Sequence, residues 1–192
     1  MRTTGCATFT APPVPDVRPA APADLPALAT FAAQAFRDTY AVTFADLMDP
    51  ADVEAYLAKA FHPGALAAEF AEPGAAFWLA EAPGGLVGYA KTLDGPAHPS
   101  VSGPRPLELA RLYASAAAIG TGVGAALMRV VLDRAARDGF GTVWLGVYLQ
   151  NARARAFYRR WGFEDVGTST FTVGADVQDD AVMARPVGPV PL

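Results

Sequence analysis

The sequence predicts a single α/β domain in which helices cover both faces of a mixed, mostly antiparallel sheet. Strand-like and helix-like segments alternate along the chain, and the last two strand-like segments follow each other directly. With 192 residues, of which 52% are hydrophobic and 18% charged, the chain fits one globular core and argues against two domains. We expect this domain at residues 16–187, between a flexible segment at 1–15 and a tail at 188–192.

The N-terminal part predicts one strand and two helices. A strand near 17–20 precedes a helix for which Asp24 is the expected N-cap. A second helix is expected to start after its cap Asp49, with Pro50 at the first helical position. Acidic residues surround this start, and they suit helix-start chemistry better than a cation site, which stays open as the alternative. These residues are Asp46, Asp49, Asp52 and Glu54.

The middle of the chain predicts a β-hairpin and a long loop. Apolar runs at 76–80 and 86–92 flank a turn with Pro83, Gly84 and Gly85. Turn-forming residues then continue from Asp94 to about Pro106, which predicts a loop.

The C-terminal half alternates strands and helices before a final pair of strands. A strand at 107–114 leads through a glycine-rich turn into a helix at about 122–138, whose apolar stripe predicts that it covers the sheet. A buried strand follows at 142–148, and a helix is expected from Asn151 to Gly162. The closing antiparallel pair is expected at the two remaining apolar segments. These are 164–174 and 180–187.

Composition excludes several classes of function. A net charge of -4 and an isoelectric point near 5.1 argue against nucleic-acid binding. The single Cys6 excludes an internal disulfide and a cysteine-based metal cage, and we expect no metal site. The sequence has neither a run of about 20 apolar residues nor an apolar signal core, so we expect a cytoplasmic protein that does not engage a membrane. His62 and His98 lie in proline-containing loops and are expected at the surface.

The turn with Gly120, Gly122 and Gly124 indicates a phosphate site. Glycines let a ligand approach the backbone closely, and the N–H groups at a helix start attract anions. Since no lysine or arginine occurs from Tyr113 to Met128, we expect backbone donors alone to hold the phosphates. A turn that merely lets the helix pack on the strand is the alternative.

Two better-known phosphate motifs do not fit this turn. The letters "GTGVGA" satisfy the dinucleotide fingerprint, but the next strand, "TVWLGVYLQN", lacks the acidic residue that would hold the ribose. A Walker A loop needs a Lys-Ser/Thr pair after the glycines, and none is present.

Two segments in order resemble the motif pair of the GNAT (Gcn5-related) N-acetyltransferases. They are "LELARLYASAAAIGTGVGAALMRVV" and "VWLGVYLQNARARAFYRRWGFEDVG", and the resemblance extends over about residues 16–187. The segments "FRDTYAVTF", "DVEAYLAKAF" and "STFTVGADVQDDAVMA" are similar to the PaiA-type subgroup, which acetylates spermidine and spermine. The resemblance implies transfer of acetyl from acetyl-CoA to a primary amine of a small molecule, with polyamines favoured.

Other interpretations of the same resemblance stay open. The acceptor could be an amino acid, an amino sugar or a protein N-terminus, and the fold could bind acetyl-CoA without turnover. A homodimer is compatible with the sequence. An acceptor mouth selective for polyamines would need carboxylates, for which Asp38, Asp46 and Asp49 are the nearest candidates.

The resemblance also implies which residues contact acetyl-CoA. Leu112, Tyr113 and Ala114 match the strand segment that pairs with the pantetheine arm, and Asn151 matches an amide beside that arm. Backbone amides of the turn would wrap the pyrophosphate. These belong to Gly120, Thr121, Gly122, Val123, Gly124 and Ala125.

Acyl transfer to an amine needs a base and an acid. An alkyl ammonium ion titrates near 10.4, so a proton must leave before the nitrogen attacks. Glu108 is our candidate base, because burial on its strand would raise the pKa; a salt bridge to an arginine across the sheet is its alternative role. The next strand offers Gly146 where some relatives carry a base, which closes that option. Tyr158 matches the usual general acid, with packing in the core as its alternative role.

Overall fold

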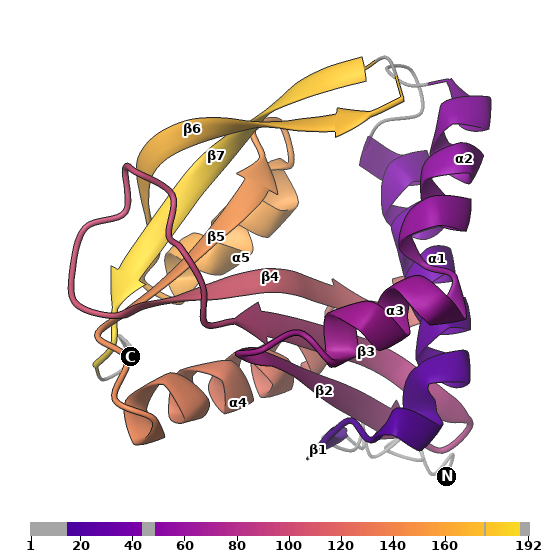
Figure 1. The fold of residues 1–192 in the computed structure, drawn as a ribbon, viewed down its shortest axis with the longest axis horizontal. Helices are drawn as coiled ribbons and strands as arrows, with labels where there is room; N and C mark the ends of the chain where they lie inside the picture. The colour runs from indigo at the N-terminus through magenta and orange to yellow at the C-terminus, as the bar shows by residue number, and fades with distance from the viewer. Residues whose placement is uncertain (1–14, 44–48, 175, 189–192) are drawn as a thin grey trace, which may run out of the picture.

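The computed structural model describes residues 15–43, 49–174 and 176–188 (Figure 1). The expected segments at 1–15 and 188–192 fall almost wholly outside these ranges, as do Cys6 and Asp46. Within the described ranges the strands form a seven-stranded sheet in the order β1-β2-β3-β4-β5-β7-β6. Their bounds are β1 Asp16–Pro19, β2 Ala75–Ala82, β3 Gly85–Leu93, β4 Pro106–Ala114, β5 Thr142–Tyr148, β6 Glu164–Val173 and β7 Asp176–Pro186.

The described helices cover both faces of the sheet, as predicted (Figure 1). One face carries α1 (Leu25–Thr43), α2 (Pro50–Ala60) and α3 (Pro63–Phe70); the other carries α4 (Val123–Arg137) and α5 (Ala152–Arg160). Each face has its own apolar core. The α4 core includes Leu107, Leu127, Val131 and Val143. The α1 core includes Leu28, Leu57, Leu66, Leu79 and Tyr89.

The sheet splits between β4 and β5, the one parallel pair among the described strands. The two strands pair only over Pro106–Glu108 and Thr142–Trp144, after which they diverge (Figure 1). The β3–β4 register shifts opposite Lys91 and Thr92, which leaves Ala110 as an extra residue in β4. Such a bulge bends its strand, so β4 follows β3 while β5 follows β7. The split therefore opens the sheet on the C-terminal side of Glu108.

The expected cap of the first helix is wrong in detail. A short 3-10 turn, Pro22–Asp24, precedes α1, and the Asp24 carboxylate accepts a hydrogen bond from the Ala21 N–H at 2.7 Å. The same carboxylate pairs with Arg18 at 2.7 Å, which ties the turn to β1. Asp24 thus caps the 3-10 turn rather than α1.

Helix α3 differs from the sequence-based prediction, in which His62 lies in a loop. The His62 ring accepts hydrogen bonds at Nδ1 from the N–H groups of Gly64 and Ala65, at 3.1 and 3.2 Å, and Pro63 takes the first helical position. Histidine is not among the usual N-cap residues, so Pro63 was the one usual start signal at this position, and it was interpreted as part of a loop. The exposed position of His62 is as expected.

The other predicted helix starts are confirmed. Asp49 accepts a hydrogen bond from the Ala51 N–H at 2.8 Å, and Asn151 accepts one from the Ala154 N–H at 3.0 Å. Gly122 precedes α4 with a φ of 98°, a left-handed conformation that favours glycine. Among the described helices, none combines the length and the apolar character that crossing a bilayer requires.

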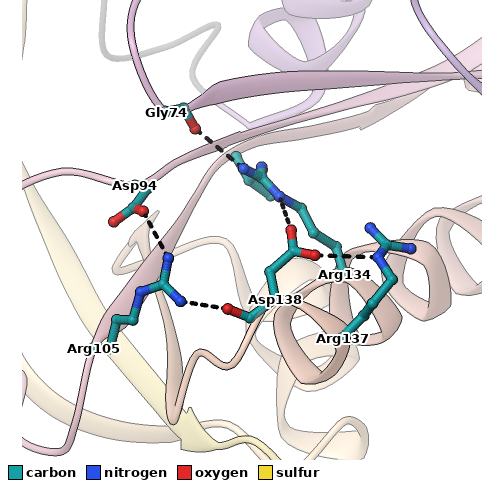
Figure 2. Close-up of polar contacts among 7 residues, drawn as sticks. Gly74, Asp94, Arg105, Arg134, Arg137 and Asp138 are labelled. Carbon is teal, nitrogen blue, oxygen red and sulfur yellow. Dashed lines mark hydrogen bonds and ion pairs between the residues drawn. The ribbon is translucent and has the colours of Figure 1, made fainter.

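The loop at 94–105 is tied down at both of its ends (Figure 2). Asp94 accepts a hydrogen bond from Arg105 at 3.3 Å, and Arg105 also donates to the Asp138 carbonyl after α4. Arg134 of α4 donates to the Gly74 carbonyl at 3.3 Å and pairs with the Asp138 side chain. Ala97 and Val101, inside the loop, pack on Trp144 and its apolar neighbours in β7. This ring of contacts fixes the loop over β5 and β7.

Candidate active site

The split between β4 and β5 opens into a cleft of about 880 Å³. We call one part of its wall the turn side. It consists of Leu112–Ala114, Gly120, Gly122, Gly124, Ala125 and Asn151. We call the other part the aromatic side. It consists of Glu108, Asp180, four residues of β5 and five aromatic residues of α1, α2, β6 and the chain between α2 and α3. The β5 residues are Trp144, Gly146, Val147 and Tyr148, and the aromatic residues are Phe36, Tyr40, Tyr56, Phe61 and Phe171.

The turn side offers unpaired backbone donors. The first hydrogen bond within α4 runs from the Ala126 N–H to the Gly122 carbonyl at 2.9 Å, and no side chain caps the helix. The N–H groups of Val123, Gly124 and Ala125 precede that bond and so have no acceptor within the helix. Space is available as well, because a Cβ built on Gly120 or Gly122 would meet no atom within 4 Å. This arrangement fits an anion such as a diphosphate.

Two residues of the expected turn set do not face the cleft. The Thr121 N–H already donates to the Ala118 carbonyl at 3.2 Å, and the Thr121 hydroxyl donates to the same carbonyl at 2.8 Å. The Val123 side chain is buried in the α4 core. Leu112, Tyr113, Ala114 and the remaining residues of the set do line the cleft. The latter are Gly120, Gly122, Gly124, Ala125 and Asn151.

The cleft also contains cations that the sequence analysis did not foresee. Arg153 and Arg160 of α5 line it together with the glycines. The prediction of backbone donors alone considered only residues near the turn in sequence, and Arg153 and Arg160 are further candidates to contact the phosphates. The signal was present in "NARARAFYRR", whose arginines share a helix with Asn151.

Tyr158 both packs in the core and reaches the cleft. Its ring makes edge contacts with Phe157 and Phe163, at centroid distances of 5.4 and 5.8 Å, and the residue is 8% exposed. Burial raises the pKa of the phenol above its usual value, and Tyr113 raises it further. Tyr158 is therefore protonated at neutral pH and can donate a hydrogen bond into the cleft.

Glu108 is the last β4 residue that pairs with β5, directly opposite Trp144. Burial raises the pKa of its carboxyl group, Lys91 lowers it, and Glu72 raises it; the net direction is upward. Within the described residues Glu108 forms no ion pair with an arginine, because Arg111 binds Glu69 instead, at 2.7 Å. The alternative structural role proposed for Glu108 is therefore wrong.

The expected acidic residues do not form the mouth of the cleft. Asp38 accepts a hydrogen bond from Gln34 on its own helix at 2.8 Å, and Asp49 caps α2. Neither lines the cleft, and Asp46 lies outside the described residues. Asp180 does line it, and burial followed by the charge of Asp179 raises the pKa of Asp180 to about 6. Sequence reasoning missed Asp180 because nothing local distinguishes it from a solvated strand residue.

No group of three or more potential metal ligands occurs among the described histidines, cysteines and carboxylates. The cleft offers groups that can transfer protons and N–H groups that can donate hydrogen bonds to an anion. This combination is suited to acyl transfer from a phosphate-bearing thioester.

Sequence comparisons link this chain to N-acetyltransferases. The profile of the family described as "Acetyltransferase (GNAT) family" matches residues 34–163. An uncharacterised N-acetyltransferase of Mycobacterium tuberculosis is 39% identical over 147 residues, which cover 74% of this chain and 90% of that protein. An uncharacterised N-acetyltransferase of Lactobacillus delbrueckii subsp. lactis is 28% identical over 149 residues, covering 78% and 86% of the two chains.

Solved structures share the fold. The PaiA N-acetyltransferase of Thermoplasma acidophilum, in complex with coenzyme A, matches with a TM-score of 0.69 and 19% identity, over 89% of this chain and 98% of that one. The ribosomal-protein-alanine N-acetyltransferase of Brucella melitensis matches with a TM-score of 0.59 and 28% identity, over 88% and 98%. The profile match runs from α1 through α5 and thus includes the turn, β5 and Tyr158. The chain belongs to the acetyltransferase (GNAT) family and is an acetyl-CoA-dependent N-acetyltransferase.

Proposed function

We propose that this enzyme acetylates a primary amine of a small molecule, with the polyamines spermidine and spermine as the first acceptors to test. The observation that carries the proposal is one continuous cleft that joins uncapped helix N–H groups, a protonated phenol and two half-buried carboxylates. The enzyme would act in the cytoplasm, where acetyl-CoA is available. The PaiA-type subgroup stays our first choice within the family.

In this proposal the turn side holds acetyl-CoA. Leu112, Tyr113 and Ala114 continue β4 beyond its pairing with β5, so their backbone groups are available to the pantetheine arm. The pyrophosphate would lie at the start of α4, on the amides at Gly120 and from Gly122 to Ala125. The Thr121 amide is already engaged and contributes the turn's shape instead. The side-chain oxygen of Asn151, Oδ1, caps α5, which leaves the side-chain NH₂ group of Asn151 free to contact the arm.

The aromatic side would receive the acceptor amine. Carboxylates at Glu108 and Asp180 attract ammonium groups, and aromatic faces bind cations. The cations Lys91 and Arg111 are both held by Glu69, at 2.9 and 2.7 Å, which offsets their repulsion of a charged acceptor. A flexible polyamine fits such a wall because it carries several ammonium groups along an apolar chain.

A protein N-terminus is the second candidate acceptor. The ribosomal-protein-alanine N-acetyltransferase of Brucella melitensis is 28% identical to this chain, which favours that alternative over free amino acids or amino sugars. A peptide would enter the same side of the cleft with its terminal amine near Glu108 and Asp180.

An amine panel with thiol detection tests the proposal. The enzyme is mixed with acetyl-CoA and spermidine, spermine, monoamines, an amino sugar or an alanine-ended peptide, and released CoA is measured. We expect release with polyamines at the highest kcat/KM. Preference for the peptide would overturn the polyamine assignment. Tight acetyl-CoA binding in calorimetry without release from any amine would show a binding protein without turnover.

A further inference from the structure

We propose that Asp180 of β7 is the general base that takes the proton from the acceptor amine, a role that rests on the proposed function. Two features of the sheet carry the inference. Asp180 projects into the cleft beside Gly146, and its carboxylate is left without a partner by the described residues.

The register of β5 and β7 places the Asp180 carboxylate beside Gly146 in the wall of the cleft. Asp180 pairs with Tyr148, and Val182 pairs with Gly146, so these residues lie on one face of the sheet together with Trp144. A Cβ built on Gly146 would lie 3.5 Å from Asp180 Oδ2. The carboxylate therefore leans across β5 into the space that a side chain at position 146 would share. A base at this place comes from β7 rather than from β5 itself.

The chemistry of Asp180 suits proton removal. The lone pairs of a carboxylate in an ion pair are occupied by its partner. Glu69 and Asp165 are examples, because each pairs with an arginine. Neither a hydrogen bond nor an ion pair from the described residues engages the Asp180 carboxylate, so its oxygens can accept a hydrogen bond from a substrate. Burial raises the pKa of Asp180 to about 6, and the charge of Asp179 adds to the effect. At pH 7 to 8 the group is ionised, yet more basic than a solvated carboxylate.

Other titratable groups near Asp180 define the controls. Tyr148 on β5 and Tyr113 on β4 both interact with the Asp180 charge, and the pKa values of both phenols are raised, chiefly by burial. Both therefore stay protonated around pH 6. Glu108 on β4 and His98 in the loop line the cleft and need variants of their own. The charged residues of the cleft are completed by Lys91, Arg111, Arg153 and Arg160.

The proposed step balances as follows. The acceptor ammonium gives one proton to Asp180, directly or through a water. The freed nitrogen lone pair forms the N–C bond with the thioester carbonyl carbon, and the C–S bond breaks with its electron pair on sulfur. The Tyr158 hydroxyl donates a proton to the sulfur and regains one from the nitrogen. Asp180 then releases its proton to water, so the products are the acetylated amine, the free thiol of CoA and one proton.

The test compares Asp180→Asn with matched variants in the full-length enzyme. For the wild type we expect kcat/KM to fall with decreasing pH near pH 6, which we call the acid limb of the pH profile. Asp180→Asn should lower kcat/KM for the amine about 10²-fold at pH 7.5 and remove this acid limb, with unchanged acetyl-CoA affinity in calorimetry. Asp179→Asn, on the exposed side of the same strand, should keep kcat and shift that limb to lower pH. Glu108→Gln and His98→Gln should retain the limb.

A rescue variant separates a base from a structural carboxylate. Asp180→Ala should lower kcat/KM for the amine. Adding Gly146→Asp to this variant should raise kcat/KM again by at least about 10-fold, because the new carboxylate enters the same space from β5. If the wild type is active and Asp180→Asn keeps the same pH profile, the assignment of Asp180 as the base is overturned while the proposed function stands. Loss of the limb in Glu108→Gln instead would transfer the role to Glu108. A wild type that binds acetyl-CoA and acetylates no amine would overturn the proposed function, and the base with it.

Discussion

The turn side and the aromatic side of the cleft are built in different ways. The turn side comes mostly from one continuous stretch, β4 through the start of α4, and it offers backbone groups. The aromatic side draws side chains from α1, α2, β4 through β7, and the segment joining α2 to α3, which are far apart in sequence. The first can be recognised from a local motif, whereas the second exists only once the sheet has formed. Substitutions should therefore affect the two sides separately.

The largest effect should come from Glu69, which supports the aromatic side. Its carboxylate accepts hydrogen bonds from Arg111 at 2.7 and 2.9 Å and from Lys91 at 2.9 Å. Glu69→Gln leaves the poorly exposed Arg111 without its counter-charge and Lys91 with only its longer contact to Glu72, so we expect a loss of about 3 kcal/mol in the free energy of unfolding. Urea unfolding measures it. Glu72→Gln, which removes a more exposed contact to Lys91 at 3.4 Å, is the control and should cost well under half as much.

The stabilisation by Glu69 should also depend on pH. Burial raises the pKa of Glu69, but Arg111 and Lys91 outweigh burial and hold it below the ordinary value of 4.5. A lowered folded-state pKa means that the stabilisation is complete above pH 4.5 and is lost as the pH falls through the folded value. The gap between wild type and Glu69→Gln should therefore narrow in acid. Acetyl-CoA affinity at pH 7 should be unchanged, and a large fall would contradict the separation of the two sides.

Gly122→Asp should instead act on the turn side alone. A carboxylate at the start of α4 would place negative charge and bulk where the pyrophosphate is proposed, so we expect acetyl-CoA affinity to fall at least about 100-fold. Gly122→Asn adds similar bulk without the charge, so its acetyl-CoA affinity should fall less. Calorimetry on folded variants measures both. Unchanged affinity in Gly122→Asp would remove the turn from the cofactor site.

Sequence reasoning found the turn side because its signals are local. Gly122 and Asn151 start helices by conformations and caps that neighbouring residues specify, and the strand at 142–148 was predicted with its observed bounds. Asp180 and Arg153 escaped because their positions in the cleft depend on strand order and helix placement. Helix α3 escaped because its cap is a histidine. What was missed therefore depends mainly on contacts distant in sequence.

Tyr158 lines the cleft and belongs to neither of the two sides, so its substitution tests the chemistry rather than either side. Tyr158→Phe keeps the ring that packs on Phe163 and removes only the hydroxyl. We expect kcat to fall on the order of 10²-fold, with acetyl-CoA affinity nearly unchanged, because the departing sulfur loses its donor. Phe163→Leu should lower the melting temperature without this loss of kcat. If Tyr158→Phe has the same kcat as the wild type, Tyr158 serves only to pack the core.

The smallest effect should come from a cation added to the turn side at Ile119. Ile119 is 46% exposed and lines the cleft, so it does not fill the core beneath the turn, and arginine there should be tolerated. An added guanidinium near the pyrophosphate should tighten acetyl-CoA by about 0.5 to 2 kcal/mol, which is roughly 2- to 30-fold. The gain should shrink with added salt, because exposed charges are screened over about 10 Å at 0.1 M ionic strength.

Arg153 and Arg160 decide how this last result is interpreted. If they already neutralise the phosphates, Ile119→Arg should gain little in the wild-type background and more once both are replaced by glutamine. If backbone amides hold the phosphates largely unaided, the gain should be the same in both backgrounds. Affinity at low salt and a melting curve for each variant separate these cases. A folded Ile119→Arg protein with no gain in either background would show that the pyrophosphate does not lie at the start of α4.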